Sequence, residues 1–209
     1  MISPSLRSRV YEHGEVFTPP AVVNRMLDHV REQLDSYEAR VLEPACGSGN
    51  FLVPILRKKL ENVDLLHASS ETERFTRGLH AVMSTYGIEL LEDNLSDCRD
   101  RLLSQLERWA KKQAPRDWLR AARKVIRLNI VCGDALSLLQ HNGKPLRFSE
   151  WSISGDLVFD RREFEFADLL AANSYRESPL FEGIATHEMF TPVKTQSKLE
   201  LSELAGLES

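Results

Sequence analysis

The segment Val41–Leu52 restricts the fold of this chain more than any other part of the sequence. A short apolar run ends at the acid Glu43, passes through a turn that contains Gly47 and Gly49, and continues as an amphipathic helical pattern. Glycines in such a turn let the backbone bend sharply and approach a ligand, because no Cβ stands in the way. The sequence therefore predicts a nucleotide-type binding loop between a strand and a helix.

The kind of nucleotide can be inferred from charge and from one missing glycine. A dinucleotide-binding fingerprint needs a third glycine three residues after the second, and Leu52 stands there. The carboxylate of Glu43 would repel a pyrophosphate, but it suits a ligand that carries an ammonium group and no phosphate. S-adenosyl-L-methionine is such a ligand, and we expect it to be the cofactor.

Four segments resemble elements of one enzyme family, in the order in which that family carries them. EPACGSGNFL at 43–52 is similar to the cofactor loop of the adenine-N6 DNA methyltransferases of restriction-modification systems. GEVFTPP at 14–20 resembles the GxxFTP element, YGIELLEDN at 86–94 the second strand with its acid, and NIVCGDAL at 129–136 the third-strand element NIxxGDAL. Taken alone, each segment also fits an ordinary turn or helix start. Together they indicate cofactor binding.

The resemblance implies a role for each matching residue. The FTP element would lie over the methionine end of the cofactor, Glu89 would accept hydrogen bonds from the ribose hydroxyls, and Asp134 would accept one from the adenine amine. Thr18 is also expected to cap the helix that follows it. The predicted cofactor-binding residues are Phe17, Thr18, Pro19, Glu43, Pro44, Ala45, Cys46, Gly47, Gly49, Asn50, Phe51, Glu89, Leu90, Asp134 and Ala135.

The family's catalytic tetrapeptide does not occur after the third strand of this sequence. The resemblance implies that a flipped adenine is held by Asp, Asn or Ser, followed by two prolines and by Tyr or Phe. Asp160 ends a strand predicted over 155–160 but has no proline after it, while Ser178, Pro179 and Phe181 keep three of the four features. Both places also fit ordinary turns. The catalytic residues therefore stay open, and so does activity by this chain alone.

The alternation of strand-like and helical segments predicts an α/β fold. The resemblance implies a doubly wound, Rossmann-like methyltransferase fold, with a mainly parallel sheet and helices on both faces. We expect one domain over residues 1–190, with a helix at 19–35, a cofactor core at 40–136 and an irregular part at 137–190. Residues 61–84 are expected to add a helix, and residues 191–209 to form a polar tail.

Charge gives an ambiguous indication of partners. The net charge of −4 does not favour DNA binding by the whole chain. A basic run nevertheless predicts a DNA-contacting face, although it also fits the solvated side of two surface helices. Its members are Arg108, Lys111, Lys112, Arg116, Arg120, Arg123, Lys124 and Arg127. A specificity or restriction subunit is a further expected partner, because no target-recognition region is visible.

The three cysteines, Cys46, Cys98 and Cys132, have no paired spacing and predict a reducing cytoplasm. Neither a metal-ligating cluster nor an apolar run long enough to span a bilayer is expected. We therefore predict an S-adenosyl-L-methionine-dependent, adenine-N6 DNA methyltransferase of a restriction-modification or phage-defence system. The alternatives are a catalytically inactive cofactor-binding subunit with an assembly or regulatory role, and a methyltransferase that acts on RNA or protein.

Overall fold

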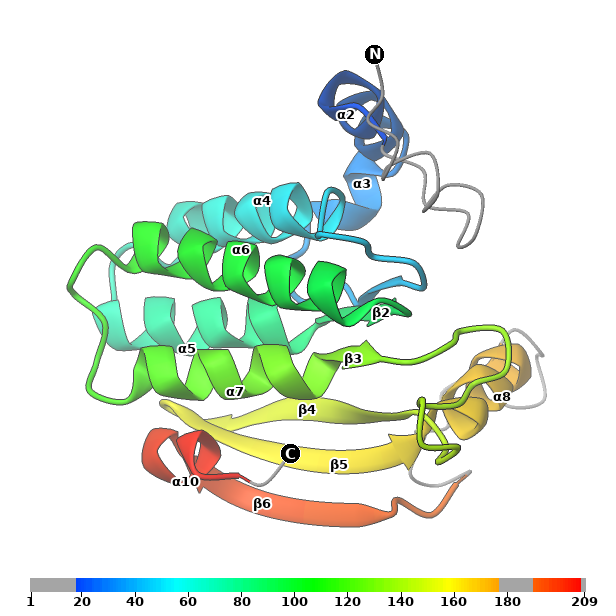
Figure 1. The fold of residues 1–209 in the computed structure, drawn as a ribbon. Helices are drawn as coiled ribbons and strands as arrows, with labels where there is room; N and C mark the ends of the chain where they lie inside the picture. Colours follow the sequence, from blue (N-terminus) through cyan, green and yellow to red (C-terminus); the bar gives the residue numbers. More distant parts are fainter. Residues whose placement is uncertain (1–17, 177–189, 208–209) are drawn as a thin grey trace.

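The computed structural model describes residues 18–176 and 190–207, which contain two separate β-sheets (Figure 1). The first sheet is parallel, in the order β1-β2-β3, and the second is antiparallel, in the order β4-β5-β6. The strands of the parallel sheet are β1 (Val41–Glu43), β2 (Thr85–Glu89) and β3 (Ile130–Cys132). Those of the antiparallel sheet are β4 (Arg147–Gly155), β5 (Val158–Glu165) and β6 (Lys194–Glu200).

Helices form every long connection within the parallel sheet. Two helices precede β1, two join β1 to β2, two join β2 to β3, and one follows each of β5 and β6. In chain order they are α2 (Pro20–His29), α3 (Arg31–Leu34), α4 (Leu52–His67), α5 (Glu71–Met83), α6 (Glu92–Ala110), α7 (Trp118–Asn129), α8 (Phe166–Arg176) and α10 (Leu201–Ala205).

The central strand β2 lies in contact with α4, α5, α6 and α7. Ile88 of β2 is fully buried and packs with Leu146, Phe148 and Phe166 in a small second core. An aromatic cluster of Phe75, Trp109 and Trp118 joins α5, α6 and α7, and Trp118 donates its indole N–H to the Phe75 carbonyl oxygen at 2.9 Å. The main core therefore extends along α4, α5, α6 and α7 and includes Ile130 of β3.

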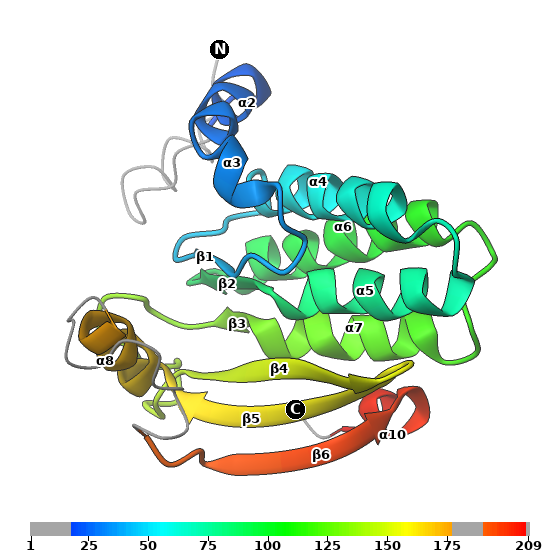
Figure 2. The same cartoon turned by 180° about the vertical axis from the view of Figure 1, so that it is seen from behind.

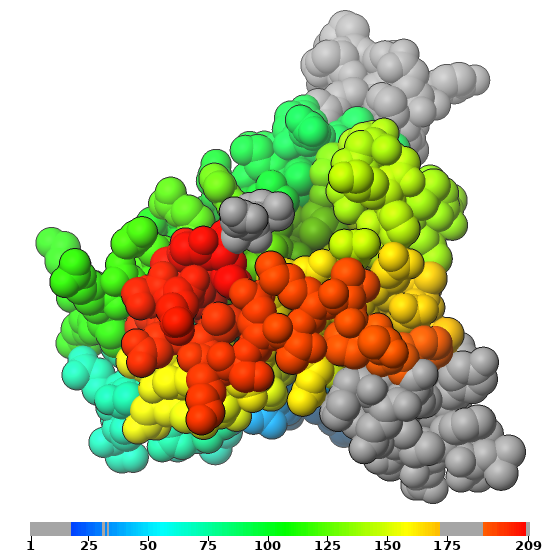
Figure 3. Space-filling view, turned by 90° about the horizontal axis from the view of Figure 1, so that it is seen from below, coloured from blue at the N-terminus to red at the C-terminus, as the bar shows by residue number. Residues whose placement is uncertain are grey.

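The antiparallel sheet packs against α5 and α7, on the side away from α4 and α6 (Figures 1 and 2). Phe159 of β5 and Leu199 of β6 are buried in the same core as α7. The short helix α10 lies on α7 through the buried Leu204. Seen from below, β6 in orange and α10 in red lie across the yellow strands (Figure 3).

The α/β class is as predicted, but the doubly wound arrangement is not formed within residues 18–176 and 190–207. A doubly wound sheet needs strands on both sides of β1, and here the order runs in one direction only. Val41 donates its amide to Ser84 on the β2 side at 3.0 Å. Alternate peptide groups of a strand face opposite sides, so those of Leu42 point to the free edge. The described strands are also not mainly parallel, because three of the six are antiparallel.

The second half of the chain is more regular than the sequence predicted. The expected irregular part contains the long hairpin β4-β5, and the expected polar tail contains β6 and α10. The strand β6 is polar because most of its side chains are exposed and its pairing with β5 uses backbone groups. Leu199 is its one buried side chain, and a single apolar position does not make the alternating pattern by which a strand is predicted from sequence.

The amino-terminal helix also differs in detail from the prediction. The chain bends at Val30, whose backbone leaves the helical region, so residues 19–35 form α2 and α3 instead of one helix. Pro19 occupies the cap position of α2 without a side-chain hydrogen bond, and the prediction that Thr18 caps this helix is wrong. The helix expected within residues 61–84 is α5, preceded by the second half of α4.

Candidate functional site

The glycine turn after β1 has the conformation that its sequence predicted. Gly47 and Gly49 have φ angles of +52° and +87°, in the left-handed region that favours glycine. A Cβ on Gly49 would lie 2.9 Å from the sulfur of Cys98, so this glycine is needed for packing on α6. A Cβ on Gly47 would have no neighbour within 4 Å. The turn is therefore packed on one side and open on the other, at Gly47.

Glu89 joins the ends of all three parallel strands. Its carboxylate accepts a hydrogen bond from the Gly47 amide at 2.7 Å and another from the Leu91 amide at 2.9 Å. Its backbone carbonyl oxygen accepts a third from Gly133, which follows β3, at 3.0 Å. Only 8% of Glu89 is exposed. A buried carboxylate thus fixes the glycine turn and leaves about two of its lone-pair positions for other donors.

The acids at the ends of β1 and β3 differ from each other electrostatically. Burial raises the pKa of Glu43, while a hydrogen bond from the Ala45 amide at 3.3 Å partly opposes that shift. The pKa of Asp134 is lowered, because its carboxylate accepts hydrogen bonds from the Leu136 amide and the Ser137 hydroxyl, each at 2.9 Å. Asp134 is thus a persistent anion, and a cation beside Glu43 would relieve its burial cost.

Two contacts at this edge were missed by the sequence analysis. Arg101 of α6 donates to the Ser48 carbonyl oxygen at 2.6 Å and to the Asn50 side chain at 3.0 Å, and so holds the turn from outside. His141 lies 2.8 Å from the Leu90 carbonyl oxygen. Both join residues about fifty positions apart, and no local pattern could have indicated them.

The structure places the other predicted cofactor residues as follows. Pro44 and Ala45 are exposed on the turn, Cys46 is buried beneath it, and Phe51 stands at the start of α4. Leu90 is 41% exposed at the end of β2, whereas Ala135 packs against the small core around Ile88. Thr18 and Pro19 precede α2, at one end of the molecule (Figure 1). Phe17 lies outside the described residues.

The candidate catalytic acid Asp160 is not part of this edge. The predicted strand 155–160 is the turn between β4 and β5 together with the start of β5. Asp160 accepts a hydrogen bond from the Lys198 amide at 2.8 Å within the antiparallel sheet. In Figure 1 this hairpin turn lies at the opposite end of the molecule from the ends of β2 and β3. Ser178, Pro179 and Phe181 lie outside the described residues.

The predicted basic face is divided between two places. Arg108, Lys111, Lys112, Arg116 and Arg120 lie around the connection from α6 to α7, far along the helices from the glycine turn, and Arg120 pairs with Asp117 at 2.7 Å. Lys124 is half-buried on α7. Arg123 and Arg127 are exposed on the part of α7 that returns toward β3.

Two further classes of site were sought in the described residues. Within 18–176 and 190–207, no group of three His, Cys, Asp or Glu side chains could hold a metal ion. None of the helices in the same ranges is both long enough and apolar enough to cross a membrane.

Comparison with known proteins identifies the segment that forms this edge. Residues 6–96 match the family model described as N-6 DNA Methylase. The match includes the glycine turn, Glu43 and Glu89, whereas Asp134 and the antiparallel sheet lie beyond it. No curated protein and no solved structure gives a significant match. Residues 6–96, which include the glycine turn and the ends of β1 and β2, are thus similar to the N-6 DNA methylase family.

Proposed function

We propose that this chain binds S-adenosyl-L-methionine at the edge formed by Glu43, Glu89 and Asp134, for methyl transfer to adenine N6 in DNA. The observation that carries the proposal is the Glu89 carboxylate, which is buried and bonded to the Gly47 amide. In the family match, this acid and this glycine turn lie in the same segment. A structural acid alone would not explain why the turn is left open beside Gly47.

The donor and acceptor chemistry of the edge suits this cofactor. S-adenosyl-L-methionine carries an ammonium and a sulfonium charge, and the edge offers three carboxylates at successive strand ends. The remaining lone pairs of Glu89 could accept the two ribose hydroxyls, and Asp134 could accept the adenine amine. Leu90, exposed beside Glu89, offers an apolar surface for the adenine ring.

When bound, the cofactor would supply an electrophilic methyl group. The residues of the chain would contribute position and charge: Glu43 would balance the cationic end, while Gly47 would permit close approach of the ligand to the backbone. Arg101 would keep the turn in place through Ser48 and Asn50. Direct transfer needs no covalent bond to the protein, so no nucleophilic side chain is required of this edge.

A second candidate function is a cofactor-binding subunit without chemistry of its own. It is favoured by the position of Asp160 in the antiparallel sheet and by the missing catalytic tetrapeptide. In either case we propose a restriction-modification or phage-defence setting with a partner for catalysis or target recognition. The free edge of β1, where Leu42 is exposed, is the place at which a partner could add a strand.

Isothermal titration calorimetry with S-adenosyl-L-methionine tests the binding step. Glu89→Gln should weaken binding about tenfold or more, because it removes a charge-assisted hydrogen-bond acceptor from the turn and the ribose. Asp97→Asn, a charge-matched change on the exposed side of α6, should leave the affinity unchanged. Equal affinities for all three proteins would refute the proposed site.

Transfer of a tritiated methyl group to unmethylated DNA separates the two candidate functions. Incorporation at adenine N6 by the chain, alone or with the product of a neighbouring reading frame, supports the methyltransferase. Tight cofactor binding without incorporation under either condition supports the inactive subunit.

A further inference from the structure

A hollow on the face below β3 is separate from the proposed cofactor edge. It lies between the end of α7 with β3 on one side and the antiparallel sheet on the other. Figure 3 shows this face recessed between the yellow-green loop 133–146 and the orange strand β6. Its volume is about 700 Å³, far above the roughly 30 Å³ that a water molecule occupies. The hollow can therefore accept part of a large ligand.

The side chains of this hollow are strongly basic, although the whole chain is acidic. One carboxylate, Glu163, is found among its lining residues. Six cationic side chains line it: Arg99, Arg127, Lys144, Arg147, Arg161 and Lys194. They come from α6, α7, the loop before β4, and all three strands of the antiparallel sheet. The sequence gives no indication of this cluster, because its members are spread over about a hundred positions.

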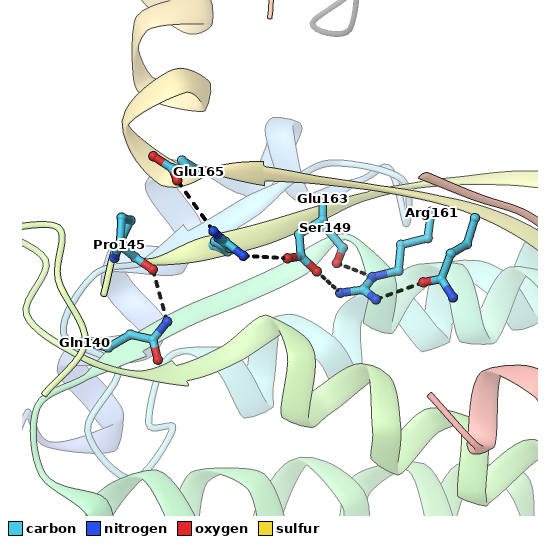
Figure 4. Close-up of polar contacts among 8 residues, drawn as sticks. Gln140, Pro145, Ser149, Arg161, Glu163 and Glu165 are labelled. Carbon is cyan, nitrogen blue, oxygen red and sulfur yellow. Dashed lines mark hydrogen bonds and ion pairs between the residues drawn. The ribbon is translucent and has the colours of Figure 1, made fainter. Parts of the chain in front are cut away.

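Two of these cations are held in a network of polar contacts (Figure 4). Arg161 is buried, donates to the Ser149 hydroxyl at 2.7 Å and to the Gln196 side chain at 3.0 Å, and pairs with Glu163. Arg147 reaches Glu163 at 3.7 Å and Glu165 at 3.6 Å. The two acids balance the two arginines, so this network contributes shape and little net charge.

The other four cations make the hollow electropositive. Arg99 donates to the carbonyl oxygen of Ile130 at 2.6 Å and to that of Arg127 at 3.3 Å, and carbonyl oxygens do not cancel its charge. Arg127, Lys144 and Lys194 are exposed. Within residues 18–176 and 190–207, none of these four side chains forms an ion pair with a carboxylate.

A second hollow continues the first. It lies between α6 and α7, shares Arg99, Arg127 and Cys132 with the first, and adds Arg123 together with two acids, Glu92 and Asp100. The first hollow is thus the more basic of the two, and a polymer with several negative charges can contact more of its cations than a single anion can. Both hollows reach Cys132, which ends β3 two residues before Asp134 of the proposed cofactor edge.

We propose that this groove, lined by Arg99, Arg127, Lys144 and Lys194, binds the phosphodiester backbone of DNA. The choice of DNA over another polyanion rests on the proposed function, while the groove itself rests on its geometry and charge. A DNA strand bound there would contact the protein through its phosphates, and these contacts would carry no sequence information. The groove would thus add affinity, and target recognition would come from elsewhere.

Fluorescence anisotropy with a labelled duplex DNA of unmethylated sequence tests this proposal on the full chain. The groove variant combines Arg127→Glu, Lys144→Glu and Lys194→Glu. The control variant combines Arg108→Glu, Lys112→Glu and Arg116→Glu, on the connection from α6 to α7. Both variants change the net charge equally, and the control residues are the part of the predicted basic run that lies away from the groove, whereas Arg127 is the part that lies in it. Thermal melting followed by circular dichroism establishes that each variant is folded.

The groove variant should bind DNA at least about tenfold more weakly than the wild type at low salt. Its plot of log K against log salt should be less steep by nearly three, since each lost phosphate contact contributes about 0.9 to the slope. The control should stay close to the wild type. If the groove variant does not fold, the single changes Lys144→Glu and Lys194→Glu, at exposed positions, should each lower the slope by about one.

Three results would overturn the proposal. One is wild-type DNA affinity in the groove variant, and another is an equal or larger loss in the control. The third is tighter groove-dependent binding of a duplex RNA or of heparin, which would assign the groove to another polyanion. Cofactor titrations on the same proteins keep the two proposals distinct. DNA binding that depends on the groove, without cofactor binding, would refute only the proposed function. Cofactor binding without groove-dependent DNA binding would refute only the proposed groove.

Discussion

In the parallel sheet, the functional groups come after the strands, at a shared edge where Glu89 joins three strand ends. In the antiparallel sheet, the charged groups lie within the strands, where Arg161 is buried among neighbours from β4, β5 and β6. The first arrangement leaves carboxylates for a ligand, and the second uses them to balance arginines. The edge of the parallel sheet thus suits the cationic cofactor proposed above, whereas the unbalanced cations of the proposed groove come mainly from α6, α7 and the loop before β4.

The two sheets also differ in how they are connected. Helix pairs that pack on the sheet join the parallel strands, so each parallel pairing links residues more than forty positions apart. The strand β6 must pair with β5 across residues 166–193, and its side chains add little apolar burial. Both sheets thus depend on non-local strand pairs, which slow folding because loop closure must precede them. The following predictions test whether the two sheets nevertheless depend on each other.

The largest effect is expected at Trp118, which begins α7 and packs in the main core that also contains Phe159 and Leu199 of the antiparallel sheet. Trp118→Ala should lower the free energy of unfolding by about 3–5 kcal/mol, since it leaves a large cavity beside Phe75 and Trp109. Urea denaturation followed by circular dichroism measures this, and Trp118→Phe should cost less. If both sheets depend on this core, wild-type unfolding is a single transition. Two transitions would show that each sheet unfolds by itself.

The next largest effect is expected at Arg161. Arg161→Met leaves Glu163 with only the longer contact to Arg147, so it should cost about 3 kcal/mol of unfolding free energy. Arg162→Met, its partly exposed neighbour in β5, is the control and should cost little. Affinity for S-adenosyl-L-methionine should not change in either variant while they are folded. Loss of cofactor affinity in a folded Arg161→Met variant would show that the proposed cofactor edge depends on the antiparallel sheet.

A pH-dependent effect is expected beneath the parallel sheet, at Lys59. Its ammonium group is buried and donates to the carbonyl oxygens of Ala39 and Ser84 and to the Ser84 hydroxyl. Burial lowers the pKa of Lys59 from 10.5 to about 7. Between these values the unfolded chain binds more protons than the folded one, so the stability of the folded state rises with pH.

From pH 7 to pH 9 this rise amounts to about 2 kcal/mol at most. Urea titrations across that range should show the rise in the wild type and a flatter profile in Lys59→Met. The same slope in both proteins would mean that the oxygen acceptors around Lys59 keep it protonated. Groups other than Lys59 that titrate in this range affect both proteins alike, so the difference between the profiles is the quantity to compare.

The smallest effect is expected at the start of α5. The Ser70 hydroxyl accepts a hydrogen bond from the Glu73 amide at 3.2 Å, so Ser70→Ala should cost about 1 kcal/mol of unfolding free energy. Ser69→Ala, one position earlier and exposed, should change stability much less. If Ser70→Ala lowered the unfolding free energy as much as Arg161→Met does, a local cap would stabilise the fold as much as a contact between distant strands, contrary to the order of effects expected here.

The parallel part was largely predictable, because its signals are local. The glycine turn, the acid at Glu89 and the helical spacing of α6 lie within short stretches of sequence. What could not be predicted is that Glu89 bonds to Gly47, forty-two positions away, and that Arg101 holds the turn. The antiparallel part could not be predicted, because β6 is polar and an arginine such as Arg161 is expected at the surface. Its burial depends on β4 and β6, which lie beside β5 only in the folded chain.

The hydrogen bond from the Gly47 amide to Glu89 has a consequence for how fast and how tightly a ligand can associate. Because the turn already has its working shape in the free protein, a ligand does not have to freeze it, and that entropic cost is absent at the moment of encounter. Association should then be a single step, so the observed binding rate should rise linearly with cofactor concentration and reach no plateau.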